Sequence, residues 1–144
     1  MTARRAEPDE LPAAAELLDR FNREYDSPTP GAATIAARLA ELDDTVVLLA
    51  GDGPDGVAVV RCRRSIFSQG DEAYLAELYV VPERRREGLG RALMDAVTGL
   101  PGVDYVHLQT SDDDTAACAL YEACGFVRTE GPSGPLMRAY ELER

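Results

Sequence analysis

Residues 80–94, VVPERRREGLGRALM, join the end of an apolar strand to a helical pattern through a turn that contains two glycines. A chain that passes from strand to helix in this way presents unpaired main-chain N–H groups at the positive end of the helix dipole. Gly88 and Gly90 let an anion approach the backbone closely, because neither carries a Cβ. Four arginines add positive charge nearby: Arg84, Arg85, Arg86 and Arg91. Residues 84–91, termed the cradle below, therefore predict a site for an anion such as a pyrophosphate.

The composition predicts one soluble globular domain that spans residues 1–144, with 45% hydrophobic and 28% charged residues. No apolar run is long enough to cross a bilayer, and the first twenty residues lack a signal-peptide core, so we expect a cytoplasmic protein. The formal net charge of −11 argues against nucleic acid or an anionic membrane as a partner, because both attract basic surfaces. This charge favours cationic substrates.

Cysteine, histidine and lysine usage excludes several kinds of chemistry. Three cysteines without a C-x-x-C pair and the single histidine, His107, suggest neither a disulfide framework nor a zinc site, so no metal is expected. All fifteen basic residues are arginines, which excludes a Schiff base, a pyridoxal phosphate anchor and a P-loop lysine. Seven of these arginines lie between residues 61 and 91, which supports a specific anion site in an acidic protein.

Hydrophobic periodicity and turn residues predict a mixed α/β order of elements. The expected strands are residues 2–6, 45–50, 57–63, 73–81 and 103–110, and a closing hairpin of residues 126–128 and 136–142 that turns at EGPSGP. The expected helices are residues 8–26, a short one near residues 35–42, one from the cradle to residue 100, and one that begins near residue 112 and ends at residue 125. The strand at residues 103–110 should lie parallel to the strand at residues 73–81, because a helix separates them.

This order of elements and two motifs resemble the GNAT superfamily of acetyl-CoA-dependent N-acetyltransferases over nearly the whole chain. The first motif is Arg or Gln, two residues, Gly, any residue, then Gly or Ala, and residues 85–90 match it, with Val80 and Pro82 before them. The second motif is an Asn-x-x-Ala-x-x-x-Tyr helix that ends in Gly-Phe. Four residues stand at its matching positions: Ala117, Tyr121, Gly125 and Phe126.

The resemblance implies an α/β (α+β) fold with a mixed, twisted sheet of six to seven strands, flanked by about four helices. The central parallel strands would splay at a β-bulge to admit acetyl-CoA, the expected cosubstrate. The main chain of the strand would contact the pantetheine arm, and the N–H of Val80 would polarise the thioester carbonyl. The expected coenzyme A contacts are Tyr79, Val80, Val81, Arg85, Arg86, Glu87, Gly88, Leu89, Gly90, Arg91, Asp114 and Tyr121. Asp114 replaces the asparagine of the motif, and its carboxylate cannot donate the amide hydrogen bond to pantetheine.

The resemblance also implies two catalytic residues. Glu77, three residues before Val80, would be the general base, directly or through water, because an alkylammonium must lose a proton before it attacks. The alternative is that Glu77 pairs with Arg61 or Arg63 across the sheet or faces solvent. Tyr121 would be the general acid for the departing thiolate, and its alternative is an ordinary packed aromatic residue. The acceptor would contact Glu77 and the end of the first helix, at Asn22, Glu24, Tyr25 and Asp26.

The sequence therefore predicts transfer of an acetyl group from acetyl-CoA to a primary amine of a small molecule or peptide, by direct attack in a ternary complex. Two alternatives stay open: a catalytically silent coenzyme A-binding or regulatory module of the same fold, and a nucleotide-phosphate binder outside the family. Homodimers are common among such folds, although no residue of this chain fixes a homodimer. The sequence leaves the acceptor and the length of the acyl donor undetermined.

Overall fold

The computed structural model describes residues 2–131 and 134–144. It contains two compact units, a larger one that ends at Gln109 and a smaller one, Thr110–Arg144, and each is described by itself. The single domain over residues 1–144 stays a prediction. None of the helices in the described part of the chain is long and apolar enough to cross a bilayer.

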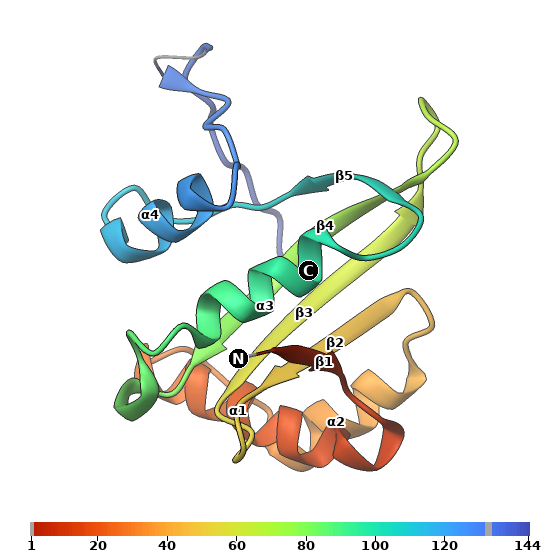
Figure 1. The fold of residues 1–144 in the computed structure, drawn as a ribbon, viewed down its shortest axis with the longest axis vertical. Coiled ribbons are helices and arrows are strands. Elements are labelled where there is room, and N and C mark those ends of the chain that lie inside the picture. Colours follow the sequence, from red (N-terminus) through yellow and green to blue (C-terminus); the bar gives the residue numbers. More distant parts are fainter. Residues whose placement is uncertain (1, 132–133) are drawn as a thin grey trace. The chain divides into compact units, whose positions relative to one another are not determined.

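The larger unit contains all of the strands (Figure 1). Its elements in chain order are β1 (Ala3–Arg5), the 3-10 turn η1 (Pro8–Glu10), α1 (Leu11–Glu24), α2 (Ala32–Glu41), β2 (Thr45–Ala50), β3 (Gly56–Arg64), β4 (Asp71–Val80), the 3-10 turn η2 (Pro82–Arg84), α3 (Leu89–Thr98) and β5 (Val103–His107). The smaller unit contains α4 (Thr115–Ala123). These bounds confirm the predicted order of strands and helices through α4.

The five strands form one mixed sheet in the order β1-β2-β3-β4-β5. The first four strands pair antiparallel. β5 lies parallel to β4, because α3 returns the chain to the end of the sheet at which β4 begins. The mixed sheet with flanking helices confirms the predicted fold class. The described residues form five strands, however, and not the expected six to seven.

A β-bulge interrupts β4 and sets the geometry of the site. Val59 of β3 pairs with Glu77, but the next residue, Val60, pairs with Leu75, so Ala76 is the extra residue of the bulge. The pairing of β4 with β5 reaches only as far as Tyr74 and His107. Beyond this point no strand of the described residues pairs with this edge of β4, termed the open edge, which confirms that the parallel strands splay at a bulge.

Helices cover both faces of the sheet. On one face, alternate sheet residues such as Val47, Leu49 and Val57 pack against Leu17 and Leu18 of α1. On the other face lies α3, whose inward side chains Leu93, Met94 and Val97 are fully buried (Figure 1). A Cβ at Gly56 would lie 3.1 Å from Leu93 Cδ1, so the glycine lets α3 approach the sheet closely. The rigid sheet between these layers positions Glu77 and the open edge of β4.

The predicted closing hairpin is wrong for the described residues, since residues 126–131 and 134–144 contain no strand. Residues 132 and 133 of its turn lie outside the described residues. Leu136, Tyr140 and Leu142, which belong to its expected second strand, are 76–86% exposed. An alternating pattern shows that a segment can pair, but a strand forms only where a partner strand and a face to cover are available. β5 also ends at His107, short of the predicted end at residue 110.

Candidate functional site

The cradle loop between η2 and α3 has the backbone of an anion site. Arg86 and Gly88 both adopt left-handed conformations, with φ of 65° and 87°, and such residues let successive N–H groups converge as in main-chain anion nests. Within the described part of the chain, the N–H groups of residues 86–88 donate no hydrogen bond. The next N–H groups open α3, where no preceding turn supplies acceptors. A Cβ at Gly88 would meet no described atom within 4 Å, so the loop is open on this side.

The arginines of the cradle differ in their partners. Arg85 turns back to donate to the Val80 carbonyl and to Glu24 Oε2, at 2.9 Å each. Arg84 binds Asp55 and Glu87, and Arg91 binds Asp95. Among the described residues, only Arg86 of these four arginines has no carboxylate or hydrogen-bond partner, and its side chain is exposed. Arg86 is therefore the arginine that can pair with an anion without breaking an existing ion pair.

The open edge of β4 presents one well-placed donor. The Val81 N–H donates to the Asp55 carbonyl at 2.9 Å and so points toward β3. Because neighbouring residues of a strand point their N–H groups to opposite sides, the Val80 N–H points toward the edge that β5 leaves open. The Val80 carbonyl on the same side accepts the hydrogen bond from Arg85 Nε. Of the strand residues expected to contact pantetheine, Val80 thus has its donor on the open side, whereas the Val81 N–H is already engaged.

Tyr79 connects β4 to the end of α1. Its buried hydroxyl donates to Glu24 Oε1 at 2.7 Å, and its ring stacks on Phe21 with centroids 4.9 Å apart. Burial, together with the neighbouring Glu24 carboxylate, raises the pKa of Tyr79 to about 12. Partial burial of Glu24 acts to raise its pKa, but hydrogen bonds from Tyr79 and Arg85 outweigh it and hold that pKa below the usual range. Glu24 thus joins α1, β4 and the cradle, and its expected role at the acceptor site stays a prediction.

Glu77 lines a recess of about 210 Å³ between the sheet and the first two helices, and the recess is also lined by Leu18, Asn22, Pro30, Ile35 and Arg38. The residue is exposed at the mouth of this recess, yet the surrounding side chains remove enough water to raise the pKa of its carboxyl. The predicted alternative that Glu77 pairs with Arg61 or Arg63 is wrong, because these arginines bind Asp44 and Glu72. Among the described residues Glu77 has no hydrogen-bond partner, so its carboxylate is available to a ligand.

The loop that follows α1 forms one wall of the recess. The Asp19 carboxylate, 8% exposed, accepts hydrogen bonds from the Thr29 hydroxyl and from Arg23 Nε, both at 2.7 Å. Asn22 donates to the Pro28 carbonyl at 3.1 Å, so its amide holds the loop as well as lining the recess. Of the other expected acceptor contacts, neither Tyr25 nor Asp26 lines the recess. Sequence reasoning missed Asp19 and Thr29. Thr29 lies within the proline-rich turn, but Asp19 lies ten residues earlier in α1, so no local pattern links the two.

The smaller unit contains the second motif as a capped helix. The Asp114 carboxylate accepts a hydrogen bond from the Ala117 N–H at 3.1 Å and so caps α4. Gly125, with φ of 92°, ends the helix. Burial raises the pKa of Tyr121 to about 12, and the Asp114 carboxylate adds to this effect. The Tyr121 hydroxyl is therefore protonated at neutral pH.

Known proteins resemble the chain in sequence and in fold. The model of the acetyltransferase (GNAT) family matches residues 11–126. An aminoglycoside N(6')-acetyltransferase type 1 of Stenotrophomonas maltophilia is 33% identical over 138 residues, which cover 90% of this chain and 88% of that protein. A mycothiol acetyltransferase of Clavibacter sepedonicus is 42% identical over 77 residues, or 54% of this chain. The matched region spans only 23–31% of the length of the mycothiol acetyltransferases.

Solved structures share the fold. A crystal structure of a presumed acetyltransferase from Arthrobacter sp. FB24 superposes with a TM-score of 0.87 at 40% sequence identity. The similarity covers 99% of this chain and 96% of that one.

Proposed function

The chain belongs to the acetyltransferase (GNAT) family, and we propose that it transfers the acetyl group of acetyl-CoA to a primary amine by direct attack in a ternary complex. The observation that carries this proposal is the relation between two groups of β4. Glu77 offers an unpaired carboxylate in a recess, and Val80, further along the same strand, offers an N–H at the splayed edge. A base and an oxyanion donor on one rigid strand are the groups that acyl transfer to an amine requires.

The cradle would bind the pyrophosphate of the cosubstrate. The N–H groups of residues 86–88 and of the first turn of α3 would donate hydrogen bonds to its oxygens. The guanidinium of Arg86, which has no partner among the described residues, would pair with its negative charge. Acetyl-CoA brings an acyl group that is already activated as a thioester. Coenzyme A contacts by Asp114 and Tyr121 of the smaller unit are part of the same proposal.

Each reacting proton has a proposed residue. Glu77 takes a proton from the ammonium group, and the free amine then attacks the thioester carbon. The Val80 N–H donates to the carbonyl oxygen as negative charge develops on it. Tyr121 donates its proton to sulfur as the C–S bond breaks. The ammonium group loses two protons in all. The first passes from Glu77 to solvent, and the second, which leaves the nitrogen of the tetrahedral intermediate, replaces the proton that Tyr121 gave to sulfur, so one proton is released per acetyl group.

The acceptor class is a primary amine of a small molecule or peptide. The aminoglycoside N(6')-acetyltransferase, which covers most of this chain at 33% identity, supports an amine acceptor. The Glu77 recess offers the amine one carboxylate that has no partner among the described residues, while Arg38 on another wall balances its charge.

The pH dependence of a Glu77→Gln variant tests the proposal. Burial raises the pKa of Glu77, so the wild-type kcat/KM should fall as pH drops through this raised pKa and the base becomes protonated. The variant should lose about 10²–10⁴-fold in kcat/KM at neutral pH. The deficit should narrow near about pH 10, where the amine loses its proton unaided.

A matched variant, Glu16→Gln, removes an exposed carboxylate of α1 and should leave the profile unchanged. A pH profile of Glu77→Gln identical to that of the wild type would reject Glu77 as the general base.

Tyr121→Phe should lower kcat without lowering thermal stability. Turnover at the wild-type level in that variant would mean that water or another group is the general acid.

A further inference from the structure

Three aromatic rings lie in contact on the sheet face that contains Glu77. Tyr74 of β4 and His107 of β5 are register partners whose ring centroids lie 5.0 Å apart. Tyr105, two residues before His107, stacks on it at 5.5 Å and is 55% exposed. Tyr74, Tyr105 and His107 are termed the ring strip below.

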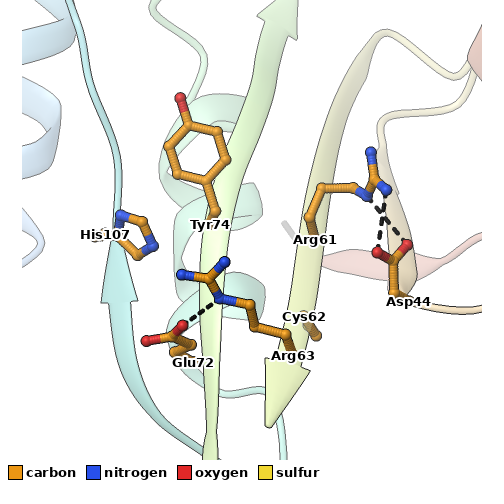
Figure 2. A pocket seen from close by; sticks show the side chains of 7 residues that line it. All are labelled: Asp44, Arg61, Cys62, Arg63, Glu72, Tyr74 and His107. Atoms are coloured by element: carbon orange, nitrogen blue, oxygen red, sulfur yellow. Dashed lines mark hydrogen bonds and ion pairs between the residues drawn. The ribbon is translucent and has the colours of Figure 1, made fainter. Parts of the chain in front are cut away.

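Two ion pairs lie beside the ring strip (Figure 2). Arg61 of β3 binds the Asp44 carboxylate through two hydrogen bonds of 3.1 and 3.0 Å, and Arg63 binds Glu72 of β4. The arginine side chains are 43% and 76% exposed, so they keep N–H groups that a ligand can reach. The two carboxylates balance the two arginines, which leaves a surface with little net charge but many donors and acceptors.

The residues of the two ion pairs, two rings of the strip, Tyr74 and His107, and Cys62 line a pocket of about 440 Å³. This volume lies within the range of about 300–1,000 Å³ that is typical of small-molecule sites. The pocket belongs entirely to the larger unit, and its walls are side chains of neighbouring sheet strands and of Asp44, which directly precedes β2. It is therefore a formed surface of the sheet.

The bulge brings this pocket beside Glu77. Val59 pairs with Glu77 and Arg61 pairs with Tyr74, so the two pairs are separated by two residues of β3, or about 7 Å along the strand. In a regular strand, residues 74 and 77 would point to opposite faces, because their spacing is odd. The extra residue Ala76 restores both side chains to the same face. A molecule whose amine reaches Glu77 can therefore reach the ring strip along the same face of β4.

We propose that the ring strip and its two ion pairs form the subsite for the rest of the acceptor, and that this part is a neutral polyhydroxylated ring, a sugar. The proposal rests on the function proposed above, because the amine on that ring is the group that Glu77 would deprotonate. A sugar has an apolar C–H face that packs on aromatic rings, and hydroxyl groups that exchange hydrogen bonds with guanidinium and carboxylate groups.

Other acceptor classes fit this surface less well. A purely apolar ring would cover the two ion pairs without replacing their hydrogen bonds to water, which costs free energy. A long polyamine would be repelled by Arg61 and Arg63, and an anionic group would be repelled by Asp44 and Glu72. A neutral sugar can pack its C–H face on the rings and, at the same time, exchange hydrogen bonds with both ion pairs.

The experiment is an NMR titration of the protein with glucosamine and, separately, with putrescine, both without acetyl-CoA. Glucosamine should shift the amide signals of Tyr74 and His107, whereas putrescine, a diamine without a ring, should shift mainly those around Glu77. Tyr74→Ala should weaken glucosamine binding about two- to tenfold, the scale of one ring contact, and leave putrescine binding unchanged. Tyr74→Phe, which keeps the ring, should bind glucosamine nearly as well as the wild type.

Phe67→Ala is the matched control, because it removes an aromatic side chain that is 91% exposed and outside the pocket. Equal loss of both ligands in Tyr74→Ala, or no loss of either, would overturn the sugar subsite. Ring-strip signals that shift with protein concentration alone would also overturn it, since a second copy would then cover the strip. Acetylation of putrescine without any binding of glucosamine would refute this subsite and leave the proposed acetyl transfer standing.

Discussion

Replacement of Glu24 with alanine should destabilise the larger unit by removing one acceptor from two donors. The Glu24 carboxylate accepts from the Tyr79 hydroxyl at 2.7 Å and from the Arg85 guanidinium at 2.9 Å. Tyr79 is 3% exposed, so its hydroxyl cannot turn to water when the carboxylate is lost. The Arg85 side chain is 38% exposed and can be hydrated instead.

The expected magnitude follows from this difference in exposure. An orphaned buried hydroxyl costs about 1–3 kcal/mol, and loss of a partly exposed ion pair costs about 0–1 kcal/mol. Glu24→Ala should therefore lower the free energy of unfolding by about 1–4 kcal/mol. Tyr79→Phe removes the donor but leaves Glu24 bound to Arg85, so it should cost only about 1 kcal/mol.

A double-mutant cycle measured by urea unfolding separates these contributions. In the Tyr79→Phe background, Glu24→Ala no longer orphans a hydroxyl, so the double variant should cost about 1 kcal/mol less than the sum of the two single variants. Glu16→Ala, on the exposed side of α1, should have almost no effect. Additive single effects, or a larger cost for Tyr79→Phe than for Glu24→Ala, would refute the proposed role of this network.

Three further changes test the loops of the site. Hydrogen bonds from Thr29 and Arg23 hold the pKa of Asp19 below its usual range. The ionised carboxylate therefore stabilises the fold above about pH 4, and this stabilisation is lost as pH falls through the lowered pKa. Asp19→Asn should therefore be less stable than the wild type in urea unfolding at neutral pH, and this gap should narrow as pH falls below about 4 and the carboxyl becomes protonated. A gap independent of pH would contradict this account. The Arg86→Gly variant should be about 1 kcal/mol more stable, because glycine adopts a φ of 65° without strain. The same variant should bind acetyl-CoA several-fold more weakly in calorimetry, and an unchanged affinity would exclude Arg86 as a contact. Gly88→Ala should lose about 1–2 kcal/mol in thermal unfolding, because φ is 87°, and an unchanged melting temperature would contradict that strain.

The sequence predicted the elements whose signals are local. The apolar runs of β2, β3 and β4, the glycine turn of the cradle and the Asp114 cap each depend on neighbouring residues, and the structure has them where expected. The closing hairpin failed because its strands need a partner that no local pattern specifies. The bulge at Ala76 also depends on the pairing with β3. The regular alternation of side chains along a strand would place Tyr74 and Glu77 on opposite faces, so their common face could not be predicted from the sequence.

The roles of charged residues were harder to predict, because ion pairs join distant parts of the chain. The four arginines of the cradle are equivalent by sequence, but Arg85 is bound by Glu24 from the end of α1, and Arg86 is left for an anion. Glu77 could equally have paired with Arg61 or Arg63 by strand spacing alone, and it does not, because Asp44 and Glu72 take those arginines. Only the folded arrangement separates an engaged charge from an available one.

The most direct test of acetyl transfer follows both products in one reaction. The protein is mixed with acetyl-CoA and a panel of primary amines that includes glucosamine and putrescine, and free thiol and N-acetylated amine are quantified together by mass spectrometry. The proposed function predicts equal amounts of the two products, formed far more slowly by Glu77→Gln at neutral pH. Binding of acetyl-CoA with neither product from any amine would contradict it and identify a catalytically silent coenzyme A-binding module.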